Sequence, residues 1–410
     1  MANISPFKAL RPLENYAKEV ATLPYDVCST IEASQFKHNP YHFYHVTRSE
    51  IDLPELTDVH SNPVYEKAAF NLQKMINDGI LVHDNDTCFY IYEMTMNGRK
   101  QTGLVCGTSI QDYNDGLIKK HENTRPDKEN DRINHIKTTE AQTGIIFLAY
   151  KDVNAISEVL NHWKSISTPL YDFLAEDNIK HTIWKIDSLE TIDQLIALFQ
   201  TEVPVTYIAD GHHRSAALAK IAAMDADNSK GNQYILSGLF PESELEIMDY
   251  NRIVKDLNSL SVAQLLEKLK ANFDVLLLGK QIYKPMQEKE FSMYVDGNWY
   301  KLQAKPNTYP DDYLERMDVN ILQENVLKTI FNIKDVRIDP RVDFVGGIRG
   351  MEALEDIVNR GEAAIAFGCY PVTIQQLFKV ADSGKVMPPK STWFEPKTRD
   401  GLIVFQTNMQ

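Results

Sequence analysis

The chain has 410 residues, of which 43% are hydrophobic and 24% are charged. These values are typical of globular proteins, and the length predicts two packed lobes rather than a disordered or fibrous chain. The formal net charge of −14 disfavours nucleic acid as a partner, because a polyanion is repelled at long range. No apolar run is long enough to span a bilayer, and Met1 to Leu10 lacks a signal pattern, so we expect a cytoplasmic protein with no membrane partner.

Four cysteines are widely scattered along the chain, namely Cys28, Cys88, Cys106 and Cys369. None of them forms the Cys-x-x-Cys spacing of a zinc or redox motif. We therefore expect buried thiols, which agrees with a reducing cytoplasm.

In the first half of the chain, hydrophobic periodicity and turn residues predict the elements in order. Asn97-Gly98 is a strong hairpin signal between two apolar runs, and the segment rich in charge that follows them predicts a surface loop or helix. The elements expected here are a helix over 64–78, antiparallel strands over 88–95 and 103–110, the charged segment over 119–137 and a strand over 144–150.

The middle of the chain predicts helices over 156–163, 189–199 and 215–224, and strands over 203–209 and 234–240. A helix over 261–273 and a hairpin over 291–302 around Asp296-Gly297 follow. The last eighty residues alternate between helices and strands, which predicts an α/β layer. The helices there are expected over 319–330, 351–360 and 373–381, and the strands over 344–345, 363–367 and 401–406.

These elements predict an α/β fold of the mixed, α+β kind with two lobes. The first lobe, over 1–260, carries a polar turn between a strand and a helix. The second, over 261–410, is expected to return to that turn through 388–397.

The polar turn consists of Asp210, Gly211, His212, His213 and Arg214. A strand that turns directly into a helix offers unpaired backbone N–H groups and the positive end of the helix dipole. Gly211 allows a close approach to a ligand, Arg214 can bind two phosphate oxygens, and the histidines add donors. Asp210 either caps the helix or holds a metal ion. The alternative is a structural turn with a cap and a surface ion pair.

The sequence from Tyr207 to Ala217 resembles the signature of a widespread prokaryotic family catalogued as a domain of unknown function. The resemblance extends to 6–12, 24–27, 39–40 and the segment Pro-Pro-Lys-Ser-Thr-Trp-Phe-Glu-Pro-Lys over 388–397. It covers nearly the whole chain.

More distantly, the Gly-His-His-Arg turn resembles the phosphate-binding turn of ParB/sulfiredoxin-like domains, a fold that includes free-serine kinases. This resemblance implies a ParB/sulfiredoxin-like nucleotide-binding core with insertions, and a nucleotide's phosphates at Gly211 to Arg214. His212 stands where sulfiredoxins have their cysteine, so sulfinic acid repair is not expected.

Two other segments can contribute to a phosphate site. In the charged segment, Glu122 or Asp210 can act as a general base while His121 orients an anion. His212 is a further candidate for the chemistry. Near the C-terminus, the polar residues Lys390, Ser391, Thr392 and Lys397 can bind phosphate, although no glycines of a phosphate-binding loop precede them. The alternatives are a solvated charged face and a tail with surface lysines.

We therefore expect a small-molecule phosphotransferase that uses ATP or ADP with Mg²⁺, with free L-serine as the acceptor by resemblance. Asp210 is the expected metal ligand. Zinc held by His212, His213, Asp210 and His121 is disfavoured, because their spacing matches no zinc motif. Two alternative functions remain open, a binding protein gated by nucleotide and a phosphoester hydrolase. A homodimer also remains open as the oligomeric state.

Overall fold

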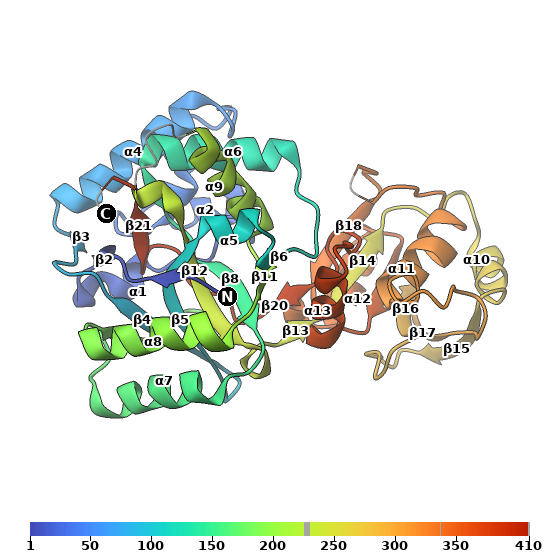
Figure 1. Cartoon of the computed structure of the whole chain (residues 1–410). Helices are drawn as coiled ribbons and strands as arrows, with labels where there is room; N and C mark the ends of the chain where they lie inside the picture. Colours follow the sequence, from blue (N-terminus) through green and yellow to red (C-terminus); the bar gives the residue numbers. More distant parts are fainter. Residues whose placement is uncertain (225–229, 337, 409–410) are drawn as a thin grey trace. The chain divides into compact units, whose positions relative to one another are not determined.

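The computed structural model describes residues 1–224, 230–336 and 338–408 and shows a mixed α/β protein, which confirms the predicted class (Figure 1). The chain forms two compact units. The first unit comprises Met1–Leu245 and Pro396–Gln410, and the second comprises Glu246–Glu395. The second unit is therefore an insertion in the first.

This division corrects the expected boundary at 260 and the assignment of 401–406 to a C-terminal lobe. The strands over Ile247–Met248 and Tyr250–Val254 pair with strands of the second unit. The strand over Val404–Gln406 pairs with two strands of the first unit. Long-range strand pairing, which the sequence pattern does not encode, decides both boundaries.

The first unit is built around a large twisted sheet with strand order β6-β11-β8-β12-β5-β4-β10-β9, and β1 also pairs with β5. Most neighbours are antiparallel, but β6 runs parallel to β11 and β8 parallel to β12. The strands are β1 (Ile4–Ser5), β4 (Phe89–Met96), β5 (Arg99–Ser109), β6 (Ile118–Lys119), β8 (Ile146–Tyr150), β9 (Tyr171–Leu174), β10 (Lys180–Ile186), β11 (Thr206–Asp210) and β12 (Tyr234–Pro241).

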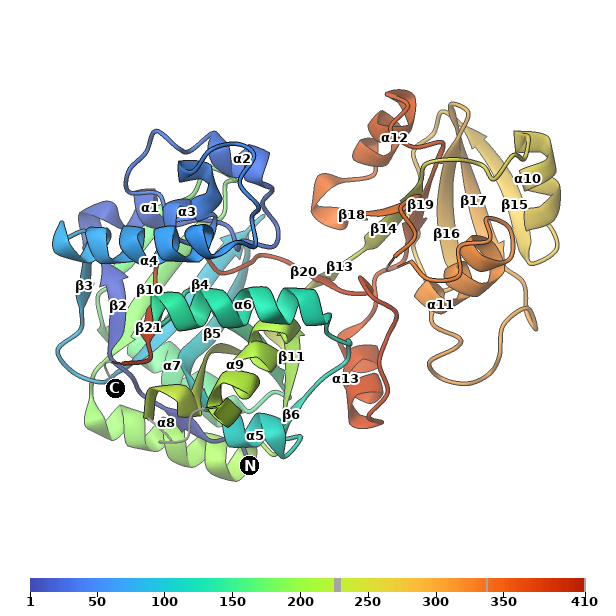
Figure 2. The ribbon, with the colours of Figure 1, turned by 90° about the horizontal axis from the view of Figure 1, so that it is seen from above.

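Helices lie on both sides of this sheet, with α7 and α8 on one side and α4, α6 and α9 on the other (Figures 1 and 2). A smaller sheet has the order β3-β2-β21-β7 and consists of β2 (Ala9–Pro12), β3 (Leu81–His83), β7 (Ala141–Gln142) and β21 (Val404–Gln406). The helices are α1 (Ala17–Val20), α2 (Thr30–Ser34), α3 (Tyr44–Thr47), α4 (Asn62–Asn77), α5 (Ile110–Asn114), α6 (Pro126–Thr139), α7 (Asn154–Ile166), α8 (Leu189–Glu202) and α9 (His212–Met224).

The expected hairpin over 88–110 is present as β4 and β5. Asn97 and Gly98 both adopt positive φ, 52° and 80°, as a tight two-residue turn requires. The charged segment over 119–137 contains a helix, which was one of the two predicted alternatives, and many of its residues are exposed, but one face of the helix is buried. Its helix α6 buries Asp131, Arg132 and His135, because residues from distant segments pair with these groups.

The second unit is an antiparallel sheet with strand order β15-β17-β16-β19-β14-β18, and β13 pairs with β20 beside it. Residues alternate between its two faces: Phe291 and Met293 pack with α10 and α11, whereas Tyr294 packs with α12. Its strands are β13 (Ile247–Met248), β14 (Tyr250–Val254), β15 (Phe273–Gly279), β16 (Glu290–Val295), β17 (Asn298–Ala304), β18 (Val342–Gly346), β19 (Ile365–Cys369) and β20 (Trp393–Phe394).

The helices of the second unit are α10 (Val262–Leu269), α11 (Asp318–Leu322), α12 (Glu352–Asn359) and α13 (Ile374–Asp382), and α11 continues as a π-helix over Gln323–Lys328. Over the described ranges of the chain, no helix combines the length and the apolar character that crossing a bilayer requires. All four cysteines are buried free thiols, as predicted, and burial raises the pKa of Cys88 to about 11.

Candidate functional site

The parallel pairing of β6 and β11 creates the candidate site. Ile118 lies opposite Thr206, and Lys119 opposite Tyr207, so the residues that follow the two strands meet at one edge of the sheet. His121 and Glu122 come from one strand end and His212 from the other. The rings of His121 and His212 lie edge to face, with centroids 4.5 Å apart.

Gly211 makes the turn from β11 into α9. Its φ of +101° is a conformation that other residues rarely adopt, and a Cβ there would lie 3.0 Å from Ile146 Cγ1. The carbonyl of Gly211 accepts hydrogen bonds from the Ser215 backbone N–H and hydroxyl at 3.0 and 3.1 Å. The first turn of α9 is thereby closed, and the ring of its first residue, His212, lies against that of His121.

Asp210 lies between two cations. Its Oδ2 accepts from Arg214 at 3.0 Å, and its Oδ1 lies 3.4 Å from Lys397 Nζ. Both cationic side chains are more than nine-tenths buried, whereas 28% of the Asp210 side chain is exposed. The charge of Asp210 is thus compensated by two cations, and its expected role as the metal ligand stays a prediction.

Arg214 is an internal group in this structure. One of its amino groups donates to Asp210 and the other to the carbonyl of Ile145 at 2.9 Å. The nearby carboxylates of Asp26 and Asp400 contribute to a raised pKa, although burial acts against it. The guanidinium therefore orients the turn. To bind two phosphate oxygens, as expected, it would have to give up its hydrogen bonds to Asp210 and to the carbonyl of Ile145.

Burial favours the neutral form of the two histidines that face each other. Burial lowers the pKa of His121 to about 4 and that of His212 well below its usual value. His212 Nε2 is buried without a hydrogen-bond partner among the described residues. His213 has a different surrounding, because its Nδ1 accepts from the backbone N–H of Arg125 at 3.3 Å, just before α6.

Glu122 completes the group at the strand ends. It is half-buried, and its carboxylate and the ring nitrogens of His121 and His212 offer ligand atoms that all lie within 4.8 Å of one another. The predicted base thus lies beside two neutral imidazoles at the start of α9.

The C-terminal residues expected at the site fall in different units. Lys397 belongs to the first unit and reaches Asp210, whereas Lys390, Ser391 and Thr392 belong to the second. Ser391 is buried and donates to the carbonyl of Pro388 at 2.6 Å, which closes a local turn. A role for these three residues in phosphate binding stays a prediction.

The sequence analysis missed Asp400, a buried carboxyl beside Arg214. A Cβ on Gly144 would lie 2.7 Å from Asp400 Oδ1 and 2.8 Å from an amino group of Arg214. Burial raises the pKa of Asp400 to about 7, against the opposing effect of Arg214. Thr398, Arg399 and Asp400 continue the polar sequence beyond Lys397, and this pattern could have identified Asp400 as a candidate.

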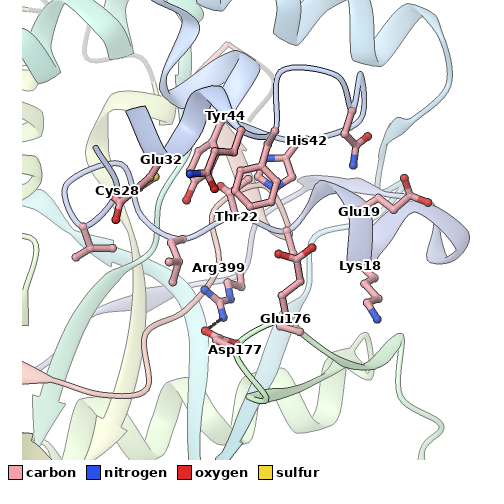
Figure 3. A pocket seen from close by; sticks show the side chains of 17 residues that line it. Lys18, Glu19, Thr22, Cys28, Glu32, His42, Tyr44, Glu176, Asp177 and Arg399 are labelled. Carbon is pink, nitrogen blue, oxygen red and sulfur yellow. Dashed lines mark hydrogen bonds and ion pairs between the residues drawn. The ribbon is translucent and has the colours of Figure 1, made fainter. Parts of the chain in front are cut away.

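A cavity of about 500 Å³ in the first unit was also missed (Figure 3). The ring of His42 stacks on Phe36 with centroids 4.2 Å apart, and Arg399 donates to Asp177 at the cavity wall. The lining carries charges of both signs and comes from three distant parts of the chain, including 18–44 and 175–177. Its size and mixed lining suit a small organic molecule.

Residues 4–320 match a protein family described as "Protein of unknown function (DUF1015)". The chain belongs to this family. The match covers most of the sequence and confirms the expected membership in a family without an assigned function. None of the curated proteins matches the chain.

Solved structures similar to this DUF1015 protein include a free serine kinase in complex with AMP, at 12% identity and a TM-score of 0.39 over 75% of this chain and 93% of that one. A conserved hypothetical protein from Pyrococcus furiosus has 15% identity and a TM-score of 0.38, over 75% and 97%. SbnI from Staphylococcus aureus, truncated at its C-terminus, has 8% sequence identity and a TM-score of 0.38, and the match covers 72% of this chain and 85% of that one. Similarities this low assign no activity to this chain.

Proposed function

We propose that the first unit binds the phosphates of ATP or ADP at the turn from Asp210 to Arg214 and transfers a phosphoryl group to a small acceptor. The parallel ends of β6 and β11 carry this proposal, because they bring His121 and Glu122 to the N-terminus of α9. Helix N-termini bind phosphate through their backbone N–H groups.

The anion-binding groups come from the turn and from the C-terminal segment. The backbone N–H groups of Gly211, His212 and His213 donate hydrogen bonds to the phosphate oxygens, and Lys397 supplies the positive charge next to them. In this scheme Asp210 holds Lys397 in place until nucleotide binds. Lys390, Ser391 and Thr392, which the sequence also predicts as phosphate ligands, belong to the second unit and have no part in this scheme.

In the reaction, the acceptor hydroxyl oxygen forms a bond to the terminal phosphorus while the bond from phosphorus to the bridging oxygen breaks. The nucleotide leaves with one phosphate fewer, and the hydroxyl proton passes to Glu122. Mg²⁺ is assigned mainly to the phosphate oxygens, because Arg214 and Lys397 already neutralise Asp210. L-serine is the first acceptor to test.

Turnover tests this proposal directly. The protein is incubated with Mg²⁺ and ATP or ADP, with and without L-serine, and nucleotide consumption and phosphorylated product are measured. We expect consumption that requires an acceptor. Glu122→Gln should lower turnover at least about 100-fold and leave nucleotide affinity unchanged. Glu202→Gln, at the exposed end of α8, is the matched control and should change neither.

Other outcomes select other functions. Consumption without any acceptor would indicate a phosphoester hydrolase, and nucleotide binding without turnover would indicate a binding protein. The absence of nucleotide binding would contradict both the phosphotransferase and the binding protein gated by nucleotide, and would leave a hydrolase of other phosphoesters to be tested.

A further inference from the structure

We propose that His121, Glu122 and His212 form a site for a divalent transition-metal ion, with Zn²⁺ as the probe of choice. Two imidazole nitrogens and one carboxylate oxygen are a donor set that such ions prefer over Mg²⁺. The inference goes beyond the proposed function, because it requires no nucleotide.

The pairing of β6 with β11 brings the three ligands together. His121 and Glu122 lie two and three residues after the end of β6, and His212 follows β11 after the glycine turn. The ligand atoms lie within 4.8 Å of one another. Ligands bound about 2.1 Å from one tetrahedral ion are about 3.4 Å apart, so small side-chain rotations suffice.

An unsatisfied buried atom supports the site independently. His212 is 7% exposed, and its Nε2 has no hydrogen-bond partner in the described part of the chain. A buried polar atom of this kind is costly unless a ligand completes it. A metal ion bound to Nε2 would satisfy the atom.

The surroundings of His121 match those of a metal-binding histidine. Its ring also forms a hydrogen bond with the backbone of Ile208 in β11. A bond from the second ring nitrogen to a backbone carbonyl fixes the tautomer and the ring orientation of a ligating histidine. Asp210 is not part of this set, because Arg214 and Lys397 occupy its two oxygens.

Three protein ligands leave coordination positions for water or a bound molecule. The ion would lie beside the Gly211 turn, where an anion held by α9 can complete its coordination. The two proposals give Glu122 different roles, as a ligand here and as a base in phosphoryl transfer. Metal binding measured without nucleotide separates them.

The test is a titration of the full chain, freed of metal by chelation, with Zn²⁺ followed by calorimetry and with Co²⁺ followed by its visible absorption. We expect one ion per chain in the wild type and an affinity at least about 100-fold lower in both His212→Ala and Glu122→Gln. His162→Ala, at an exposed position on α7, is the control and should bind as the wild type does.

Circular dichroism of each variant checks that it is folded. Since Glu122 is only half-buried, Glu122→Gln tests the site even where His212→Ala perturbs folding. The proposal is overturned by a wild type that binds no stoichiometric ion, or by a folded variant that binds with unchanged affinity. Neither result depends on whether nucleotide binds.

Discussion

Asp400 connects the C-terminal segment with the polar turn. Its backbone pairs with that of Thr22, and its carboxyl lies beside Arg214, with Oδ1 lacking a hydrogen-bond partner among the described residues. Asp26 and Arg132 are the other charged groups that act on it. Burial outweighs the attraction of the two arginines, so the fold favours the neutral carboxyl.

Because the pKa of Asp400 is raised, we expect the stability of the protein to depend on pH. The pKa of Asp400 rises from 3.8 to about 7 on folding, so the native state holds its proton more tightly than the unfolded chain between these values. This raised pKa contributes on the order of 2–4 kcal/mol to the free energy of unfolding. The contribution is complete below pH 4 and is lost as the pH rises through 7. Urea unfolding at pH 5 and pH 8 measures it.

Asp400→Asn removes the titrating group and keeps the shape. The variant should therefore lose less stability than the wild type between pH 5 and pH 8. Equal losses in the two proteins would show that Asp400 does not titrate in this range.

At the scale of elements, two aspartates of α6 form ion pairs, one of them buried and the other exposed. Asp131 is buried and accepts from Arg132 Nε at 2.8 Å, from the Tyr65 hydroxyl at 2.9 Å and from His60 Nδ1 at 2.9 Å. These partners fasten α6 to α4 and to the segment before it. In the first turn of α6, by contrast, more than half of the Asp127 side chain is exposed.

The two aspartates should therefore differ in their effect on stability. Asp131→Ala leaves Arg132 buried without its ion pair and is expected to cost about 3–5 kcal/mol in the free energy of unfolding. Asp127→Ala breaks only an exposed pair and should cost less than about 1 kcal/mol. Urea unfolding at pH 7 compares them, and similar values would refute the packing described for α6.

Elements with local signals could be predicted from the sequence. The hairpins around Asn97-Gly98 and Asp296-Gly297 are present because these residues adopt the positive φ that tight turns require. The helix expected over 64–78 is α4. The burial of α6 could not be predicted, because its many charges are typical of a surface segment and their partners are remote in sequence.

The same division holds for the candidate site. The turn at Gly211 follows from its own sequence, and its residues could be named in advance. The approach of Lys397 to Asp210, 187 positions away, and the parallel pairing of β6 with β11 depend on the whole fold. A sequence reading therefore finds the residue types but not their partners.

At the scale of the whole molecule, the second unit has the properties of an independently folding insertion. It has its own apolar cores, and Ile247 pairs with Phe394 close to its two ends. We expect residues 246–395, expressed alone, to unfold cooperatively on heating and to give dispersed NMR signals. A fragment with no cooperative transition would show that the second unit needs the first for its stability.

Nucleotide binding at the polar turn is the claim on which the proposed function depends. Calorimetric titration of the full chain with ADP or ATP and Mg²⁺ measures it, with Lys397→Met as the test variant and Lys151→Met, at an exposed position, as the control. We predict binding that weakens at least about tenfold in Lys397→Met and is unchanged in Lys151→Met. A wild type that binds neither nucleotide, or a Lys397→Met variant that binds as tightly as the wild type, would contradict the phosphate site.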